Sequence, residues 1–329
     1  PDKFKYAIAD LPELKEAVQG WYKRRYNVDL EEDEIMSVSG SQEGLAHIGL
    51  VLFNPGDICL VPTPCYPIFE IGPFLSGAKI EYYKLKEENN YELDLDSIPE
   101  ELAYKAKAIV VSYPANPVSA SVRPEFYPKL IAWAKKYNVI VIHDNAYSEI
   151  TFEGFEGTSF LCFEGAKEVG VEFNSLSKAY NLTGARISFC LGNSKIISEF
   201  KKLRSQIDYG IFLPIQYAAI AALNSPMDNI EKNREEYRIR REVLSEEFGK
   251  AGLPVKLSTG SMFMWTRIPE KYKSSNDFVV ELMEKTGVIV TPGSAFGEEG
   301  EGYIRIALTH TTEEIKEAAK AIKESGMFL

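Results

Sequence analysis

Residues 175–186 read Ser175-Leu-Ser-Lys-Ala-Tyr-Asn-Leu-Thr-Gly-Ala-Arg186, a polar stretch that lies between two apolar runs. The runs, residues 171–176 and 187–191, are typical of buried strands. Lys178 is therefore expected at the end of a buried strand, where poor solvation disfavours its charged form and makes its amine nucleophilic. Such an amine forms Schiff bases with carbonyl compounds.

The groups around Lys178 suit a phosphate. Ser175 and Ser177 supply hydroxyls, and the Arg186 guanidinium matches the geometry of a phosphate group. The stretch therefore indicates an anchor for a phosphorylated aldehyde. On this stretch alone, an exposed lysine in a polar loop is an equally good interpretation.

The size and charge of the chain limit its class. Its 329 residues are typical of one large domain with a smaller one. Hydrophobic residues make up 45% and charged residues 26%, as in ordinary soluble globular proteins. The formal net charge of −11 argues against nucleic acid or an anionic membrane surface as a partner. A phosphate site must then be a local basic pocket.

Cysteine and histidine usage indicates a reduced protein without a metal site. Cys59, Cys162 and Cys190 lie within apolar runs, and neither they nor Cys65 belong to a CxxC pair. We therefore expect reduced core residues in a cytoplasmic protein. The three histidines lack the spacing of metal ligands, and His143 is expected to be a packed residue rather than a catalyst.

The beginning of the chain, Pro1-Asp-Lys-Phe-Lys-Tyr6, is charged and shows no signal peptide. The first residue is not methionine, so we expect an incomplete chain. The longest apolar stretch, residues 211–223, contains Pro214 and Gln216 and is too short to span a bilayer. No membrane partner is expected.

Helical and strand patterns alternate along most of the chain. Residues 11–26 and 124–137 show helical periodicity and carry a proline near the start. Short apolar runs typical of buried strands occur at residues 57–61, 108–112, 139–143, 171–176 and 187–191. This alternation predicts an α/β large domain, in which helices cover both faces of a mostly parallel sheet.

The pattern changes near Met227. Residues 227–251 predict a long, highly charged helix that leaves the large domain. The remainder predicts a smaller α+β domain, with strands and helices at residues 262–268, 276–285, 303–308 and 312–324. We therefore expect a large domain at residues 1–226 and a small C-terminal domain at residues 227–329.

Four polar clusters follow predicted strands, at the edge where open α/β sheets bind ligands. Three of them contain Asn116, Asp144 and Lys178. The fourth, Ser39-Gly-Ser-Gln-Glu-Gly44, follows a strand-like run and precedes an apolar helix, whose free backbone N–H groups would hold a phosphate. One such turn is also an ordinary helix cap, but four clusters on one edge predict a single binding site.

The residues in these clusters suit a pyridine ring bound at Lys178. A carboxylate such as Asp144 keeps a pyridine nitrogen protonated, so that the ring stabilises a carbanion; alone, it is also a common turn residue. Tyr147 and Asn116 could donate hydrogen bonds to a phenolate oxygen on the ring. Tyr66 could stack flat on the ring, or it could be a core tyrosine in a proline-fixed turn.

With these motifs, the sequence resembles the fold-type I pyridoxal-phosphate enzymes of the class I/II aminotransferase family, and within it the aspartate and LL-diaminopimelate aminotransferase branch. The resemblance runs from Leu11-Pro-Glu-Leu14 to Gly302-Tyr-Ile-Arg-Ile-Ala307 and is most specific around Lys178. It implies pyridoxal 5′-phosphate as the cofactor, amino acids and 2-oxo acids as substrates, and a homodimer with shared active sites.

The resemblance also implies roles for individual residues. Lys178 would carry the cofactor as a Schiff base and move the proton, Asp144 would pair with the pyridine nitrogen, and Tyr147 and Asn116 would contact the ring oxygen. The cofactor phosphate would be held by Ser41 and Gln42 through their backbone, and by Ser175, Ser177 and Arg186. The substrate would be held by Arg305 through its α-carboxylate and by Asn116, and Tyr6 would reach the phosphate in the neighbouring subunit.

The chain departs from the family pattern in three places. The usual Asn-Pro-Thr-Gly turn is Asn116-Pro-Val-Ser119, so the path of its backbone is in question without the glycine. The glycine expected two residues after Arg186 is Ser188. Family members also carry a few dozen residues before the equivalent of Pro1, which supply an interface arm, part of the small domain and a loop over the substrate.

The leading hypothesis is an aminotransferase that works by ping-pong half-reactions. The donor would be aspartate-like or diaminopimelate-like, and the acceptor a 2-oxo acid such as 2-oxoglutarate. A lyase that ends in β-elimination or decarboxylation uses the same carbanion and is the second hypothesis. A non-catalytic ligand-sensing homologue is the third, although the sequence contains no basic patch or helix-turn-helix for DNA.

Overall fold

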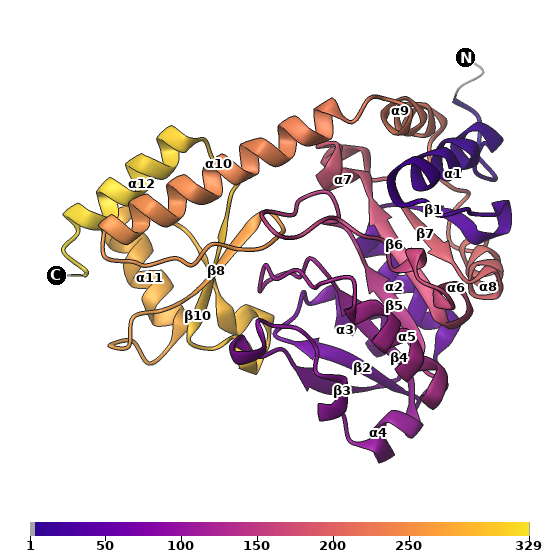
Figure 1. Cartoon of the computed structure of the whole chain (residues 1–329), viewed down its shortest axis with the longest axis horizontal. Helices are drawn as coiled ribbons and strands as arrows, with labels where there is room; N and C mark the ends of the chain where they lie inside the picture. The colour runs from indigo at the N-terminus through magenta and orange to yellow at the C-terminus, as the bar shows by residue number, and fades with distance from the viewer. Residues whose placement is uncertain (1–3, 329) are drawn as a thin grey trace.

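The computed structural model describes residues 4–328, and two β-sheets organise them (Figure 1). The larger sheet has the strand order β1-β7-β6-β5-β4-β2-β3, and the smaller has the order β8-β10-β9. The strands of the larger sheet are β1 (Ile35–Val38), β2 (Ile58–Thr63), β3 (Lys79–Lys84), β4 (Ala106–Ser112), β5 (Ile140–Asp144), β6 (Gly170–Ser175) and β7 (Ser188–Gly192). Those of the smaller sheet are β8 (Phe263–Arg267), β9 (Thr291–Pro292) and β10 (Tyr303–Ala307).

The larger sheet is mostly parallel, as predicted. Neighbouring strands from β3 to β6 pair in parallel, whereas β7 is antiparallel to both β6 and β1. Every predicted apolar run forms a strand within one or two residues of its expected bounds. β3 was missed because most of its side chains are exposed, so that the strand has no apolar run.

Helices cover both faces of this sheet, again as predicted. They are α1 (Pro12–Tyr26), α2 (Ser41–Leu52), α3 (Ile68–Leu75), α4 (Glu100–Lys105), α5 (Phe126–Tyr137), α6 (Ala166–Val169), α7 (Leu176–Ala179), α8 (Ser194–Arg204) and α9 (Leu213–Leu223). Alternate residues of each central strand enter opposite cores. In β4, Ile109 and Val111 pack in the core with α1, α5 and α9, and Ala108 and Val110 pack in the core with α2, α3 and α8.

The remaining helices cover the small sheet. They are α10 (Asp228–Lys250), α11 (Ser275–Thr286) and α12 (Thr312–Glu324). In Figure 1, α10 runs from the large sheet to the small sheet, as expected for residues 227–251. Residues that follow β5, including Tyr147 and Ile150, also join the core of the small sheet. We keep the domain boundary between residues 226 and 227 as a proposal.

The expectation for His143 is confirmed, whereas that for the cysteines is only partly correct. His143 is fully buried and its Nδ1 lies 3.1 Å from Oε2 of Glu172, so it is a packed residue. All four cysteines are free, but Cys162 is exposed, so its placement in the core was wrong. It is the last residue of a short 3₁₀ helix, Phe160–Cys162, in which Phe160 and Leu161 are the buried residues. None of the described helices is long and apolar enough to cross a membrane.

Candidate active site

One cavity of about 250 Å³ collects the predicted site residues, with the exception of Tyr6. It opens at the carboxyl ends of the central strands and is closed on its other side by β8 and β10. The predicted residues that line it are Ser41, Gln42, Tyr66, Asn116, Asp144, Tyr147, Ser175, Ser177, Lys178, Arg186 and Arg305.

The order of the strands explains this convergence. β4, β5 and β6 are parallel neighbours, with Ser112 paired opposite Asp144, and Asp144 opposite Phe173. The segments that follow these strands therefore start at one edge of the sheet, and this is where open α/β sheets bind ligands. Asn116 comes from the first segment, Asp144 ends the second strand, and Lys178 follows the third.

Lys178 lies on the single turn of α7 and is half-buried. Burial is the main cause that lowers the pKa of its amine, with a further contribution from Arg186. Asn233 of α10 holds its backbone, because the Asn233 side chain donates a hydrogen bond to the Lys178 carbonyl at 2.9 Å. The lysine is therefore a partly desolvated amine on a fixed backbone.

Asp144 is the acidic group of the cavity. Only 5% of the residue is exposed, and no donor among the described residues reaches its Oδ1 atom. Burial raises the pKa of this carboxyl to about 6. A buried acceptor without a partner is costly in a folded protein, so a carboxylate of this kind in a cavity wall is suited to a ligand that supplies a donor.

The opposite end of the cavity is basic. Gly40 caps the N-terminus of α2 with a φ of 86°, and a Cβ there would lie 2.0 Å from an Nη atom of Arg186. The guanidinium thus rests against the start of the helix, where the first N–H groups have no partner within the helix. Arg186 and this helix end form a cradle for an anion.

Two serines complete the wall beside the cradle. Ser175 caps α7, and its hydroxyl accepts hydrogen bonds from the Ser177 N–H at 3.2 Å and from the Ser188 hydroxyl at 2.8 Å. The residue at 188, where the family has glycine, therefore supports the site through Ser175. The other departure is also accommodated, because Ser119 adopts a φ of 57°, in the left-handed region that glycine favours.

Arg305 projects from β10 and contacts the segment after β4. Its Nη1 donates a hydrogen bond to Oδ1 of Asn116 at 2.8 Å, which leaves the amide nitrogen of Asn116 as a free donor. Burial lowers the pKa of the guanidinium. We find no ion pair between Arg305 and a carboxylate within residues 4–328. A half-buried cation without an anionic partner is suited to an anionic ligand.

Tyr66 lies in the cavity wall, whereas Tyr6 lies outside the cavity. The Tyr66 hydroxyl donates a hydrogen bond to Oε1 of Gln42 at 3.2 Å, and both residues line the cavity. Tyr6 lies outside the cavity with 78% of its surface exposed, and its ring packs 5.0 Å from that of Tyr209. Tyr6 therefore completes no site within its own chain.

Sequence reasoning missed four residues in the cavity wall, namely Leu45, Ala146, Thr183 and Phe263. Leu45 and Phe263 belong to apolar patterns that also describe core residues, so periodicity could not separate them. Ala146 lies between the two predicted residues Asp144 and Tyr147, and Thr183 lies in the stretch between Lys178 and Arg186. For Ala146 and Thr183, closeness in the sequence to predicted site residues was the only sign of a place in the cavity wall.

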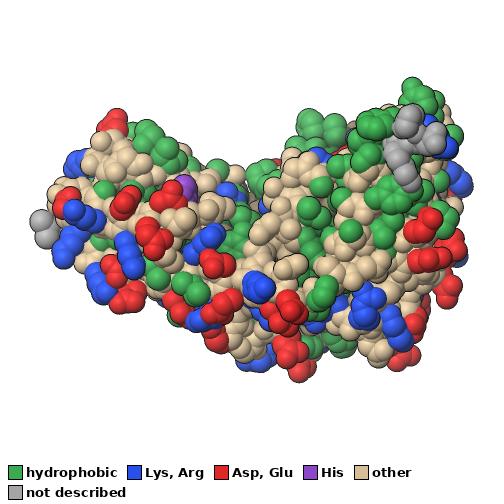
Figure 2. All heavy atoms as spheres, turned by 90° about the horizontal axis from the view of Figure 1, so that it is seen from above, with side chains coloured by type: hydrophobic (Ala, Val, Ile, Leu, Met, Phe, Trp, Pro, Cys, Tyr) green, Lys and Arg blue, Asp and Glu red, His purple; other side chains and the backbone are tan. Residues whose placement is uncertain are grey.

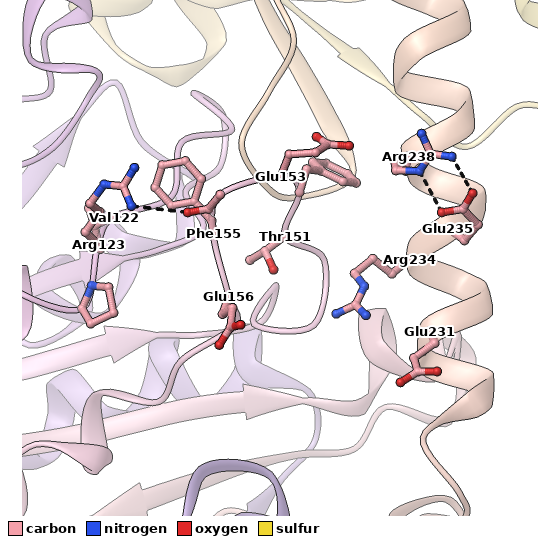
Figure 3. Close-up of a pocket in the computed structure, with 13 residues that line it drawn as sticks. Val122, Arg123, Thr151, Glu153, Phe155, Glu156, Glu231, Arg234, Glu235 and Arg238 are labelled. Carbon is pink, nitrogen blue, oxygen red and sulfur yellow. Dashed lines mark hydrogen bonds and ion pairs between the residues drawn. The ribbon is translucent and has the colours of Figure 1, made fainter.

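A larger cavity, of about 860 Å³, lies between the loop that follows β5 and helix α10 (Figure 3). Arg238 in its wall is paired with Glu235, and Arg123 donates to the Gly154 carbonyl. Its described lining contains no lysine, and glutamates outnumber arginines there. It therefore offers neither an amine nucleophile nor an anion cradle.

Comparisons with known proteins identify the relatives of this chain. The family model for aminotransferase class I and II matches residues 2–322. LL-diaminopimelate aminotransferase from Aquifex aeolicus is 46% identical over 325 residues, covering 98% of this chain and 84% of that protein. The enzyme of the same name from Halothermothrix orenii is 46% identical over 316 residues, covering 96% of this chain and 81% of that protein.

Solved structures show the same fold. The substrate-bound BacF structure from Bacillus subtilis superposes with a TM-score of 0.95 at 34% identity, and the match covers 98% of this chain and 82% of that one. The match of the family model and the identity to the relatives extend over nearly the whole chain. The protein therefore belongs to the aminotransferase class I and II family and is a pyridoxal-phosphate-dependent aminotransferase.

Proposed function

We propose that this enzyme transfers the amino group of LL-diaminopimelate to 2-oxoglutarate in two ping-pong half-reactions. The observation that carries the reaction type is the position of Arg305, a half-buried cation without an anionic partner, in the same cavity as Lys178. The choice of donor is supported by the names of the relatives that are 46% identical.

The cavity fits pyridoxal phosphate at both of its ends. The unpartnered Oδ1 of Asp144 suits a protonated pyridine nitrogen, and the cradle of Arg186 and the α2 N-terminus suits the phosphate. When bound, the cofactor supplies an aldehyde for the amino group and a ring that stabilises negative charge at Cα. The residues proposed to hold it are Lys178, Asp144, Tyr147, Asn116, Tyr66, Ser41, Gln42, Ser175, Ser177 and Arg186.

Lys178 is the proposed proton carrier. Its lowered pKa leaves more of the amine neutral at neutral pH, and a neutral Nζ can accept the proton from Cα of the amino acid. The short α7 turn and the hydrogen bond from Asn233 keep the backbone of this lysine in place during the transfer. Preorganisation of this kind lowers the entropic part of the barrier.

Arg305 is the proposed ligand of the substrate α-carboxylate. A guanidinium binds a carboxylate through two parallel N–H···O bonds. While the carboxylate is held in this way, the Cα–H bond is the one presented for cleavage, which favours amino transfer over loss of CO₂. Because every α-amino acid carries this carboxylate, Arg305 serves the donor and the acceptor alike.

We also propose a homodimer in which Tyr6 reaches the cofactor phosphate of the partner subunit. Exposed apolar residues of the N-terminal segment pack against those near α9, with Phe4 and Phe212 ring centroids 5.6 Å apart. Figure 2 shows hydrophobic side chains, in green, gathered at the end of the molecule that carries the N-terminus, at the right of the view. A contiguous exposed apolar patch is typical of an interface, and two-fold symmetry makes each contact reciprocal.

The substrate assignment predicts a specific pattern of turnover. The holoenzyme should form glutamate from 2-oxoglutarate with LL-diaminopimelate as donor, and roughly tenfold or more faster in kcat/KM than with aspartate or alanine. Chromatography of the amino acids formed measures this. Release of CO₂, or of pyruvate and ammonia, without any oxo acid would instead support a lyase.

The buried carboxyl of Asp144 predicts a pH-dependent stability in the apoprotein. The pKa is about 6 in the fold against 3.8 as the reference value, so the native state holds a proton that the unfolded state releases. Stability is therefore lost as the pH rises from about 4 through 6. Asp144→Asn removes this loss. Across that window, the free energy of unfolding of the variant, measured by urea unfolding, should rise by about 3 kcal/mol relative to that of wild type.

Two controls define this experiment. Asp96→Asn changes an exposed aspartate and should leave the pH profile of stability unchanged. Added pyridoxal phosphate should shrink the difference between wild type and Asp144→Asn, because the ring nitrogen gives the ionised carboxylate a partner. Parallel profiles for wild type and Asp144→Asn in the apoprotein would show that Asp144 is not desolvated.

The dimer predicts a separation of two effects. Tyr209→Glu places a charge in the apolar patch and should dissociate the dimer in light scattering. Tyr6→Phe should stay dimeric but bind pyridoxal phosphate roughly tenfold more weakly, because a hydroxyl to the phosphate is lost. Leu257→Glu, at an exposed apolar residue between α10 and β8, is the control and should stay dimeric. An active wild-type monomer would contradict the dimer.

A further inference from the structure

The guanidinium of Arg305 lies between two phenylalanine rings. Its Cζ is 4.0 Å from the ring centroid of Phe263 and 4.7 Å from that of Phe296. Phe263 is the first residue of β8, and Phe296 ends the 3₁₀ helix Gly293–Phe296. Two separate segments of the small domain thus contact the same cation.

The polar contacts of Arg305 leave it free for a ligand. Nη1 is bonded to Asn116, and Nη2 lies 3.5 Å from the hydroxyl of Thr291. The Nε atom is buried and has no partner among the described residues. The described residues therefore supply aromatic contacts and neutral acceptors but no anion, so the guanidinium keeps unused N–H donors.

The two rings are themselves held in place. The Phe296 carbonyl accepts a hydrogen bond from the Cys65 N–H at 2.9 Å, and its ring meets that of Trp265 edge-on at 5.9 Å. Trp265 in turn stacks on Tyr303 at 5.1 Å, with only 9° between the planes. Phe263 has an edge contact with Tyr147 at 6.0 Å. The rings are fixed by packing on both the small-domain and the large-domain sides.

We propose that Phe263 and Phe296 are positioning residues, which hold the Arg305 guanidinium between them so that it binds planar carboxylates and discriminates against tetrahedral anions. The proposal rests on the proposed role of Arg305 as the ligand of the substrate α-carboxylate. Cation–π attraction holds the guanidinium against the rings, most strongly where water is excluded. The ligand then approaches along the guanidinium plane.

The shape of the anion decides the outcome. A carboxylate bound by two N–H groups lies in the guanidinium plane together with its Cα atom. A phosphonate that uses two oxygens in the same way projects its third oxygen and its carbon out of that plane. The rings therefore favour the carboxylate in two ways, because they orient the cation and because they occupy space beside it.

A pair of matched ligands tests this in the holoenzyme. 2-Methylalanine carries the α-amino and α-carboxylate groups but no Cα proton to lose, and (2-aminopropan-2-yl)phosphonate is its tetrahedral counterpart. Neither carries a side chain that depends on the identity of the donor. The dissociation constants are measured from the change in cofactor absorbance for wild type, Phe263→Leu and Phe296→Leu.

Each leucine variant should bind 2-methylalanine roughly tenfold more weakly than wild type, because the cation–π contact and the fixed orientation are lost. Binding of the phosphonate should change little or improve. The dissociation constant of the phosphonate divided by that of 2-methylalanine should therefore fall. Phe263→Tyr keeps the ring and should restore the wild-type ratio. Phe278→Leu, in the core of the same domain and without contact to Arg305, controls for general loosening.

The outcomes separate this proposal from the one on which it rests. Arg305→Gln should abolish the preference for the carboxylate, and wild-type binding of both ligands by this variant would remove the role of Arg305 itself. If Arg305→Gln loses 2-methylalanine while both leucine variants keep the wild-type ratio, the positioning role is overturned and the role of Arg305 stands. An equal weakening of both ligands in the leucine variants would overturn the discrimination.

Discussion

The parallel pairing of β4, β5 and β6 is the constraint on which the active site depends. Each strand delivers one group to the same edge of the sheet: Asn116 after β4, Asp144 at the end of β5 and Lys178 after β6. No local motif could bring these groups together, because they lie far apart in the sequence. The apolar residues that make the strands pair in this order therefore also determine where the proposed cofactor site lies.

The cavity also contains polar and charged groups that are unpaired among the described residues, which the order of the strands alone does not explain. Among residues 4–328, it contains an acceptor without a partner at Asp144 and a cation without an anion at Arg305, and burial acts on the pKa of both. Such groups reduce stability in the empty fold and become favourable when a ligand supplies the opposite charge. The two phenylalanines at Arg305 belong to the same design, because they orient a charge without neutralising it.

The sequence predicted those parts that leave a periodic or chemical pattern. The buried strands, the helix at residues 227–251 and the polar residues of the cavity belong to this group. β3 left no such pattern because most of its side chains are exposed. Phe263 and Phe296 could not be found either, because an aromatic residue beside a cation and one in a core look alike in sequence. The sequence also raised a question that the structure answers. Ser119 replaces the glycine of the family turn, but its backbone adopts the left-handed conformation that the glycine would have.

The most direct test of this account is the position of the covalent cofactor bond. Borohydride reduction of the holoenzyme, followed by proteolysis and mass spectrometry of the peptides, identifies the residue that carries the cofactor. The account predicts that the added mass lies on Lys178, which is the one lysine in the cavity wall among residues 4–328. Cofactor fixed at a different lysine would contradict it, because Asp144 and the phosphate cradle would then surround the wrong amine.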